Sequence, residues 1–457
     1  MTTAQLIIVG GGPAGYRAAE RAAAAGLQTI LAEQRALGGV CLNEGCIPSK
    51  ALLHSAKVLD TIKSAGTYGV TAGDASLDHP KVLARKNRVV KMLTSGVAKS
   101  LEQAGVTVLQ ATARLEGKQG ENFLVRIGDE LCAAPRILIA TGSAPAIPPI
   151  PGLKEALDSG FAITSREALS LPEVPEELAV IGGGVVGLEL ACYYKAAGSK
   201  VTVLEMLPRI AAGMDWDISD MLLAQLKKKG ISFQLGCRVT RVEEGSLTYE
   251  VDGKEQVVSA RKLLLAGGRV PVTEGLGLET VGLSPGSKGQ LETDQRMRTA
   301  VPGIWAAGDV NGRSLLAHTA YREAEVAVND MVGIPDAMSY HAIPAVLYTS
   351  PEAAGIGLTE QAAREQGIDI QTASLSLRYS GRFLAEVQGG DGICKVIADG
   401  KGERLLGVHL LGSYASELIS GVAPIMESGM KIADLKKTVY AHPTVGELLR
   451  DALFALR

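Results

Sequence analysis

Short apolar runs alternate with helix-like stretches along the first part of the chain, and small or polar residues follow each run. Leu6 to Val9 leads into Gly10-Gly11-Gly12-Pro13-Ala14-Gly15, then into an alanine-rich stretch and a second apolar run, Thr29 to Ala32, which ends on Glu33. A strand, a G-x-G-x-x-G turn, a helix and a strand closed by an acid form the dinucleotide-binding pattern. In that pattern the pyrophosphate lies at the helix N-terminus and the acid binds a ribose hydroxyl.

The pattern occurs a second time. Leu178 to Ile181 leads into Gly182-Gly183-Gly184-Val185-Val186-Gly187, and the next apolar run, Val201 to Leu204, ends on Glu205. In both copies the acid stands 23 residues after the first glycine (10 to 33 and 182 to 205). One copy alone would be compatible with an unrelated glycine-rich turn. Two copies at one spacing predict two dinucleotide sites.

Further strand ends support a duplication. Ile137 to Gly142 resembles Leu263 to Gly268, and each is an apolar run that ends in small residues. Another run, Ile304 to Ala307, leads into Gly308-Asp309, where the acid is expected to bind a ribityl or ribose hydroxyl. On its own, Gly-Asp would be interpreted as a turn.

The order of these patterns predicts an interrupted first domain. It is expected to cover residues 1–145, to resume at 270–335, and to enclose a second domain at 146–269. Four prolines between Pro145 and Pro151 are typical of a linker.

Residues 336–457 are expected to form a third domain of the α+β type. Three strand-like runs are followed by helical periodicity; these segments are Thr372 to Leu377, Cys394 to Ala398, Leu405 to Leu411, and Ala415 to Met430.

Length and charge agree with this organisation. A chain of 457 residues exceeds the size at which a single core stops growing. The net charge of −3, without a basic block, speaks against a nucleic-acid partner. No segment has the length and apolarity of a membrane span. The N-terminus has no charge before Arg17 and resembles neither a signal nor a transit peptide, so a cytoplasmic location is expected.

Two of the six cysteines, Cys41 and Cys46, form a close pair soon after the first acid. In an ideal helix, residues five apart rise ~7.5 Å and rotate ~140°, which places their Cα atoms about 8.7 Å apart. A disulfide needs a Cα separation below about 7 Å, so it would require an irregular turn, which Gly45 can supply. A zinc site would need further Cys or His nearby, and no metal site is predicted. These observations favour a redox-active pair, and the remaining alternative is two unrelated buried thiols.

His442-Pro443-Thr444-Val445-Gly446-Glu447 stands near the C-terminus. Thiol–disulfide exchange needs a base, and a His oriented by a carboxylate is suitable near neutral pH. Alternatively, Thr444 is the N-cap of a helix and Glu447 completes a capping box. Both interpretations stay open at this point.

These residues resemble the pyridine nucleotide–disulfide oxidoreductases from end to end. The resemblance is strongest to the members that oxidise dihydrolipoyl groups. It is carried by the sequence Gly-Gly-Val-Cys-Leu-Asn-Glu-Gly-Cys-Ile-Pro-Ser-Lys from Gly38 to Lys50, Ala-Gly-Asp at 307–309, Leu-Ala-His at 316–318, Tyr-Thr-Ser-Pro-Glu at 348–352 and His-Pro-Thr-x-x-Glu at 442–447. The resemblance implies an α/β fold with two Rossmann-like domains, for FAD and NAD, and a C-terminal α+β dimerisation domain.

The resemblance also implies roles. Cys41 would be attacked by the dihydrolipoyl group, and Cys46 would lie against the flavin as its disulfide partner. His442, oriented by Glu447, would serve the cysteines of the other subunit of a homodimer. Lys50 would lie near the flavin N5 edge and pair with Glu189, although a helix-dipole role for Glu189 is the alternative.

The expected cofactor contacts follow from the same resemblance. Those for FAD are Gly10, Gly12, Pro13, Ala14, Gly15, Glu33, Gly39, Val40, Cys41, Lys50, Ala113, Thr141, Gly142, Ser143, Asp309, Leu316, Ala317 and His318. Those for NAD are Gly182, Gly184, Val185, Val186, Gly187, Glu189, Glu205, Val239 and Gly268. NAD is favoured over NADP because Glu205 would repel a 2′-phosphate; Arg209 is the nearby cation that could weaken this preference.

The chain departs from the family pattern at Val40, Ala113, Gly267 and Gly446, where Thr, Gly, an apolar residue and Ser are frequent. These departures bear on efficiency and exact substrate. The lipoyl group is expected to come from a partner, either an acyltransferase lipoyl domain or an H-type protein of glycine cleavage. The alternatives are a related NAD(P)H-dependent disulfide or metal-ion reductase, and a flavoprotein that works mainly as a bound subunit or redox sensor.

Overall fold

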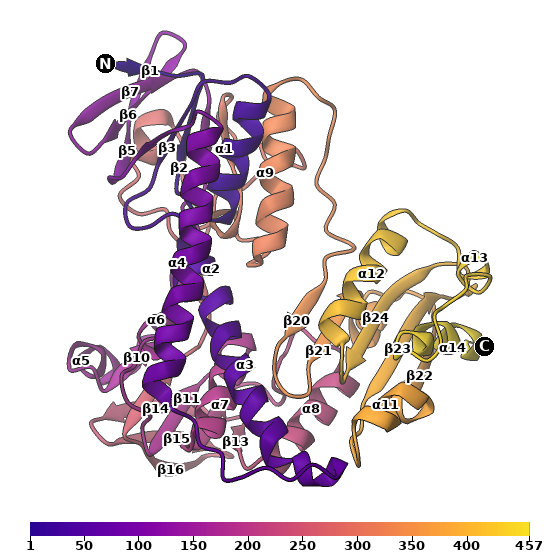
Figure 1. Cartoon of the computed structure of the whole chain (residues 1–457). Coiled ribbons are helices and arrows are strands. Elements are labelled where there is room, and N and C mark those ends of the chain that lie inside the picture. Colours follow the sequence, from indigo (N-terminus) through magenta and orange to yellow (C-terminus); the bar gives the residue numbers. More distant parts are fainter. Residues whose placement is uncertain (457) are drawn as a thin grey trace. The chain divides into compact units, whose positions relative to one another are not determined.

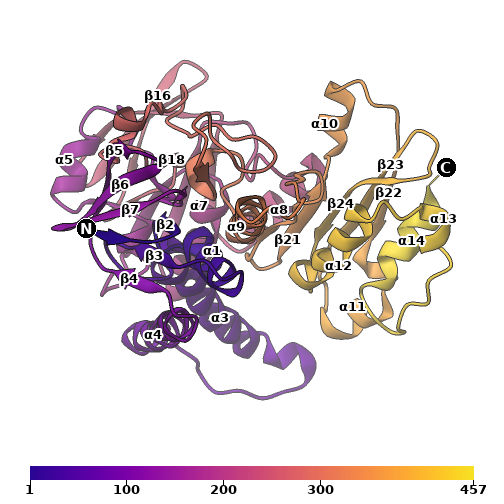
Figure 2. The same ribbon diagram turned by 90° about the horizontal axis from the view of Figure 1, so that it is seen from above.

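A computed structural model describes residues 1–456, which form two compact units (Figures 1 and 2). The first unit contains Met1–Ala51, Leu83–Ala146 and Gly268–Ser339. The second contains Leu52–Val82, Ile147–Gly267 and the chain from Tyr340 to the C-terminus. The finer division into the four segments expected from the sequence stays a prediction.

A five-stranded parallel sheet with the strand order β19-β8-β2-β3-β4 forms the centre of the first unit. Its strands are β2 (Leu6–Val9), β3 (Thr29–Ala32), β4 (Thr107–Leu109), β8 (Ile137–Ile139) and β19 (Ile304–Ala306). Most of these segments are wholly apolar because both faces of a parallel sheet are covered. The helices α1 (Pro13–Ala24) and α9 (Ala317–Met331) lie side by side on the sheet (Figure 1).

Smaller elements complete the first unit. A second sheet has the order β1-β7-β6-β5, with β1 (Thr2–Thr3), β5 (Ala113–Gln119), β6 (Asn122–Ile127) and β7 (Glu130–Ala134). The helices that follow the first nucleotide motif are α2 (Gly39–Glu44) and α3 (Cys46–Lys63), and the next helix is α4 (His79–Gln103). The first unit contains α3 up to Ala51 and α4 from Leu83 onward. The strands β9 (Ser143–Pro145) and β18 (Arg269–Pro271) pair antiparallel, so the chain leaves the unit and returns to it at neighbouring positions.

The second unit contains a parallel sheet of the same kind, with the order β10-β17-β11-β12-β13. Its strands are β10 (Ala162–Thr164), β11 (Glu177–Ile181), β12 (Lys200–Glu205), β13 (Ser232–Leu235) and β17 (Lys262–Leu265). A smaller antiparallel sheet contains β14 (Arg238–Glu243), β15 (Ser246–Val251) and β16 (Lys254–Ser259). The helices of this segment are α5 (Leu153–Asp158), α6 (Ser165–Ala168), α7 (Val185–Ala197) and α8 (Trp216–Lys228). In both units the strand before the glycine motif lies centrally, which confirms two Rossmann-like domains.

The C-terminal part is a five-stranded antiparallel sheet with the order β20-β21-β24-β23-β22. Its elements are β20 (Ala345–Leu347), β21 (Ala353–Gly357), α10 (Glu360–Glu365), β22 (Ile370–Ser376), α11 (Gly381–Glu386), β23 (Ile393–Asp399), β24 (Leu405–Leu411), α12 (Ala415–Glu427), α13 (Ile432–Leu435) and α14 (Glu447–Ala455). This confirms the expected α+β domain. The helix predicted to reach Met430 ends at Glu427, because Gly429 adopts φ +63 and turns the chain.

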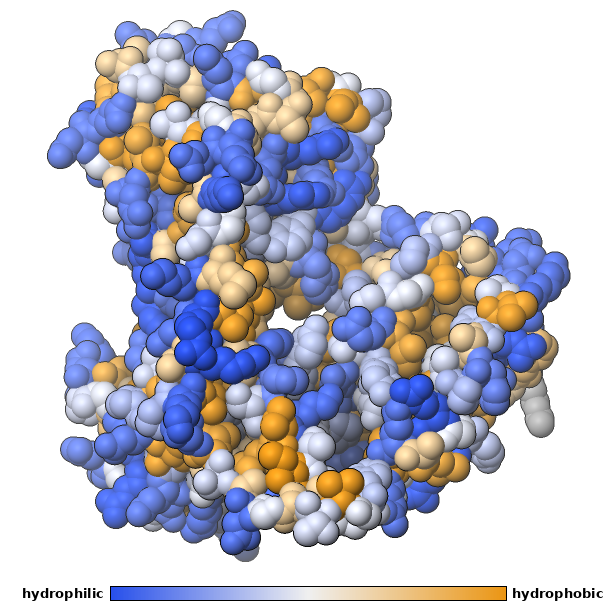
Figure 3. Space-filling model, in the orientation of Figure 1, coloured by the Kyte–Doolittle hydropathy of each residue, from blue (hydrophilic) through white to orange (hydrophobic). Residues whose placement is uncertain are grey.

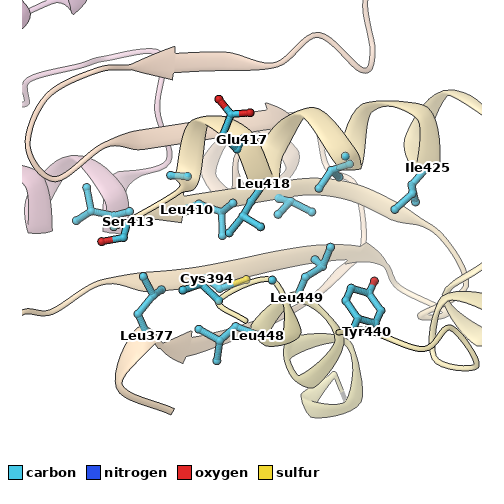
Figure 4. A pocket seen from close by; sticks show the side chains of 18 residues that line it. Leu377, Cys394, Leu410, Ser413, Glu417, Leu418, Ile425, Tyr440, Leu448 and Leu449 are labelled. Carbon is cyan, nitrogen blue, oxygen red and sulfur yellow. The ribbon is translucent and has the colours of Figure 1, made fainter. Parts of the chain in front are cut away.

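An apolar cavity of about 270 Å³ lies inside this C-terminal domain, between α12, α14 and the sheet (Figure 4). Its walls include Cys394, Leu418 and Leu449 (Figure 4). Tyr440 and Val445, from the segment that carries His442, also line it.

A buried ammonium group ties α8 and α10 to the C-terminal sheet. The Lys395 Nζ lies 2.9 Å from Asp215, 2.7 Å from Asp217 and 2.7 Å from Glu360. Asp215 is completely buried and also accepts the backbone N–H groups of Asp217 at 3.1 Å and Glu360 at 3.0 Å. One carboxylate therefore caps the starts of two helices and neutralises a lysine on a third element.

The cluster is expected to make stability depend on Lys395. The Lys395→Met variant should lose ~3–5 kcal/mol at pH 7, because removing the lysine leaves the buried Asp215 carboxylate uncompensated. Denaturant unfolding followed by circular dichroism measures the loss. Lys431→Met, which removes an exposed ion pair with Glu403, is the control and should unfold close to wild type.

The stability lost in the Lys395→Met variant should become smaller as the pH falls. Burial raises the pKa of Asp215, but the Glu360 amide and the Lys395 ammonium together hold it below its ordinary value. Lys395 also lowers the pKa of Glu360. The stability gained from these carboxylates is thus present above about pH 4 and is lost at lower pH. A deficit that does not shrink as the pH falls from about 4 to about 2 would contradict this account.

Candidate active site

The first glycine motif packs backbone against backbone. A Cβ added to Gly10, whose φ is +109, would lie 2.3 Å from the carbonyl oxygen of Ala140, and one added to Gly15 would lie 1.7 Å from the oxygen of Gly10. Both distances are far below van der Waals contact, so neither position has room for a side chain. The turn therefore holds the start of α1 directly against the carboxyl ends of β2 and β8.

The middle of the motif is open. A Cβ on Gly12 would meet only the Cα of Gly39, at 3.8 Å. Gly12 is also the N-cap of α1, no side chain caps this end of the helix, and Pro13 occupies the first turn. The N–H groups at this helix start point to space that no side chain fills, which is the arrangement that binds a pyrophosphate.

Glu33 closes this cradle from the end of β3. Its carboxylate accepts the N–H groups of Gly11 and Arg35, each at 2.7 Å, and the residue is buried. The acid is thereby fixed beside the glycine turn, where a ribose hydroxyl would lie.

The second motif repeats this geometry. A Cβ on Gly182 would lie 2.4 Å from the Ala266 oxygen, and one on Gly187 would lie 2.1 Å from the Gly182 oxygen. Gly184 has nothing within 4 Å of an added Cβ, and no side chain caps α7 there. The next residues, Val185 and Val186, are apolar and exposed. The second cradle therefore has the same open helix start as the first.

The surroundings of Glu205 fit an unphosphorylated ribose. Its carboxylate accepts the N–H groups of Gly183 at 2.6 Å and Leu207 at 2.7 Å. Arg209 is held by Asp220 at 3.0 Å and lies over the Trp216 ring, 4.3 Å from its centroid. The cation that could have favoured NADP is thus engaged by other groups.

Three polar residues meet at the start of β9 in the first unit. The Ser143 hydroxyl bonds Asp309, and Arg269 donates to the Ser143 hydroxyl at 2.7 Å and to its carbonyl at 2.6 Å. Burial raises the pKa of Asp309. The expected pair of Ser143 and Asp309 is brought together. Arg269 was not predicted, because nothing near it in the sequence marks it as their partner.

The other predicted cofactor residues occupy varied positions. Ala113 is buried at the start of β5, Thr141 donates to Val272, and Gly142 and Gly268 have positive φ. Leu316, Ala317 and His318 form the start of α9. The Val239 side chain lies in an apolar core, so only its backbone could contact a nucleotide. Glu189, in the second unit, accepts the Tyr348 N–H at 3.0 Å; its pairing with Lys50 stays a prediction.

The helix that carries Cys41 ends just before Cys46. Gly45 separates α2 from α3 with φ −145 and ψ −108, which is the irregular turn that the spacing required. The Cys41 thiol hydrogen-bonds Cys46. Their disulfide stays a prediction, but the turn removes the geometric obstacle of a continuous helix.

The groups around Cys41 also determine the pKa of its thiol. The hydrogen bond to Cys46 and burial raise the pKa of Cys41, and the Lys50 ammonium lowers it only in part. The helix start that carries Cys41 lies against the first cradle, since a Cβ on Gly39 would fall 2.6 Å from the Cα of Gly12. The sulfur pair is therefore built into the wall of the first dinucleotide site.

His442 and Glu447 also meet. The His442 Nδ1 lies 2.9 Å from one carboxylate oxygen of Glu447, and the other oxygen accepts the Thr444 N–H at 2.8 Å. The expected capping box is only half formed: Gly446 is the N-cap of α14, and the Thr444 hydroxyl donates to Ala441 instead. The His442 side chain is 80% exposed, so its Nε2 is accessible to a substrate.

Between residues 1 and 456, no helix has the length and apolarity to cross a membrane. The same stretch contains no group of three or more His, Cys, Asp or Glu side chains placed to hold a metal ion.

Two glycine cradles with the chemistry of dinucleotide sites, and a cysteine pair against the first of them, define a dinucleotide-dependent thiol–disulfide oxidoreductase. The chain belongs to the pyridine nucleotide-disulphide oxidoreductase family, whose model matches residues 4–324, and the family's dimerisation domain matches residues 343–453. Members of the family use FAD and NAD.

Curated relatives match along nearly the whole chain. The dihydrolipoyl dehydrogenase of Chlorobaculum tepidum is 40% identical over 454 residues, covering 98% of this chain and 96% of the relative. That of Thermus scotoductus is 38% identical, covering 100% and 98%. The mitochondrial enzyme of Schizosaccharomyces pombe is 36% identical, covering 98% and 89%.

Solved structures are similar over the same extent. LpdA from Mycobacterium tuberculosis has a TM-score of 0.90 at 25% identity, covering 100% of this chain and 99% of that one. The Cu(II) complex of the HOCl-induced flavoprotein disulfide reductase RclA from Escherichia coli has a TM-score of 0.87 at 28% identity and full coverage of both chains.

The open middle of the second cradle gives a sharp test of nucleotide binding. The Gly184→Ala variant should fold normally, because its Cβ has nothing within 4 Å, yet bind NADH at least about tenfold more weakly, since the methyl group occupies the space of the pyrophosphate. Fluorescence titration with NADH measures the affinity, and thermal unfolding checks the fold.

Gly213→Ala is the matched control, because Gly213 is equally open but lies outside both cradles. It should leave both the melting temperature and the NADH affinity unchanged. Unchanged NADH affinity in the Gly184 variant would show that the cradle does not hold the nucleotide.

Proposed function

We propose that the protein oxidises protein-bound dihydrolipoyl groups and passes the electrons to NAD⁺, as a homodimer. The observation that carries this proposal is the Cys41–Cys46 pair at the helix break, against the first dinucleotide cradle. Relatives named dihydrolipoyl dehydrogenase, at 36–40% identity over nearly the full chain, support the choice of substrate.

The cradle residues would hold the cofactors. Gly10, Gly12, Gly15, Glu33 and Asp309 would bind FAD. Gly182, Gly184, Gly187 and Glu205 would bind NAD. When bound, FAD accepts two electrons from the cysteine dithiol and NAD⁺ removes them as NADH.

The chain's own residues would carry out the thiol exchange. A substrate thiolate attacks the Cys41 sulfur, the Cys41–Cys46 bond breaks, and Cys46 leaves as a thiolate. The second substrate thiolate then attacks the substrate sulfur bound to Cys41 and releases Cys41. The substrate is oxidised to a disulfide, and the cysteine pair is reduced by the same two electrons.

His442 would take the proton of the attacking thiol. Its Nδ1 faces the Glu447 carboxylate, so Nε2 is the nitrogen left for the substrate. We propose that His442 of one subunit serves the cysteine pair of the other. Exposed apolar side chains in the matched dimerisation domain, among them Tyr379, Leu384, Val439 and Phe454, agree with a covered face. Figure 3 shows apolar residues, in orange, at the surface among hydrophilic ones.

The lipoyl group would be supplied by an acyltransferase lipoyl domain or by an H-type protein of glycine cleavage. The cytoplasmic location expected from the sequence stays a prediction.

Anaerobic mixing of the purified, flavin-loaded protein with dihydrolipoamide, followed by NAD⁺, tests the proposal. Dihydrolipoamide should bleach the flavin absorbance, and NAD⁺ should restore it with formation of NADH. Reduction by NADH or NADPH without any reduction by dihydrolipoamide would overturn the proposal. It would favour the related disulfide or metal-ion reductase, a class to which the similarity to RclA also points.

The two cysteines should be indispensable for the exchange. The Cys46→Ser variant should keep its flavin and its NADH affinity but lose dihydrolipoamide turnover by on the order of a thousandfold or more, because a serine cannot form the disulfide. Cys192→Ser, which changes a thiol on α7 far along the chain from the pair, is the control. Full turnover in the Cys46 variant would contradict the assigned role.

A further inference from the structure

Two tyrosines from distant parts of the sequence meet in the first unit. Tyr16 lies on α1 and Tyr321 on α9, 305 residues apart, and their hydroxyl groups hydrogen-bond each other. Their ring centroids are 5.8 Å apart, with 60° between the ring planes. Tyr16 is buried, whereas Tyr321 is partly exposed.

The pair lies beside the cysteine helix. The starts of α1 and α2 touch through Gly12 and Gly39; Tyr16 is one turn into α1, and Cys41 is the third residue of α2. Burial and the Tyr321 hydroxyl raise the pKa of Tyr16, and a charge on Cys41 raises it further. Burial raises the pKa of Tyr321 as well, and charges on Cys41 and Cys46 add to the rise. Both phenols therefore stay protonated next to the sulfur pair.

The pair has one hydroxyl hydrogen more than it uses. Two phenols carry two O–H donors, and the bond between them consumes one. Either hydroxyl can donate within the pair, so one hydroxyl hydrogen is left for another acceptor. Tyr321, the more exposed of the two, is the better placed to offer it when Tyr16 donates within the pair.

Packing alone does not account for the two hydroxyls. α1 and α9 are already joined by Arg17, which donates to Glu325 at 3.0 and 2.7 Å, and by Arg21, which donates to Asn329 at 3.1 Å. Two phenylalanines would supply the same ring contact without placing polar groups in a largely buried site.

We propose that Tyr321, oriented by Tyr16, is a positioning residue for thiol exchange and donates its hydroxyl hydrogen to the Cys41 thiolate. This bond stabilises the sulfur when the oxidised substrate leaves Cys41. The inference rests on the proposed exchange at Cys41 and adds to it an uncharged donor on the substrate side of the cysteine pair.

Alkylation of the reduced, flavin-loaded protein by iodoacetamide tests the inference without any lipoyl substrate. The rate at Cys41, assigned by peptide mass spectrometry, is measured against pH. In Tyr321→Phe the pH of half-maximal rate should rise by about one unit, which is the size expected for one hydrogen bond to a charged group. The kcat/KM for dihydrolipoamide should fall by about tenfold.

Two variants complete the design. Tyr16→Phe should shift the profile in the same direction but less, and the double variant should equal Tyr321→Phe, because the two hydroxyls act in series. Tyr249→Phe, whose hydroxyl bonds Gln256 at 2.8 Å in the β15–β16 hairpin, should match wild type. Thermal unfolding verifies that each variant is folded.

The outcomes separate this inference from the proposed function. An alkylation profile of Tyr321→Phe that superimposes on wild type overturns the inference, whether or not dihydrolipoamide is oxidised. A shifted profile together with no dihydrolipoamide oxidation by the wild type upholds the Tyr321–Cys41 bond and overturns the proposed substrate.

Discussion

The contact of bare backbone with bare backbone at the glycine turns is the constraint on which the rest of the molecule depends. Gly10 lies against Ala140 and Gly182 against Ala266, at distances that leave no room for a Cβ. This contact fixes each helix start at the carboxyl ends of two parallel strands, where nucleotides bind in such sheets. A second contact, between Gly12 and Gly39, attaches the cysteine helix to the first of these sites. Position, and not any special reactivity of a single residue, makes the cysteines part of a redox centre.

Most of the framework could be predicted because its signals are local. Buried parallel strands are continuous apolar runs, so β2 and β3 have the limits that the sequence indicated. The antiparallel strand β24 also has the predicted limits. The glycine spacing identifies both cradles, since only small residues fit there. The need for an irregular turn at Gly45 followed from helix geometry alone. The turn is present, although the sequence could not give its dihedral angles.

The features that escaped prediction join residues far apart in the sequence. Lys395 meets Asp215 across 180 residues, Arg269 meets Ser143 across 126, and Tyr321 meets Tyr16 across 305. No periodicity or motif connects such positions, because their proximity depends on how separate elements pack. The capping box at Thr444 is only half formed for a local reason: the Thr444 hydroxyl donates to Ala441, and the helix starts two residues later than expected.

In the thiol exchange proposed above, the charges around the cysteine pair favour a base from elsewhere in the protein. Lys50 is the cation whose charge reaches Cys41, and it only partly offsets the hydrogen bond and burial that raise the pKa of that thiol. Tyr16 and Tyr321 are neutral phenols and cannot accept a proton. An attacking thiol therefore needs an external acceptor, and His442 is suited to this role because its Nδ1 is held and its Nε2 is free of the Glu447 contact. Its high exposure on a domain that matches the family's dimerisation domain is the expected state of a base that acts on a second subunit.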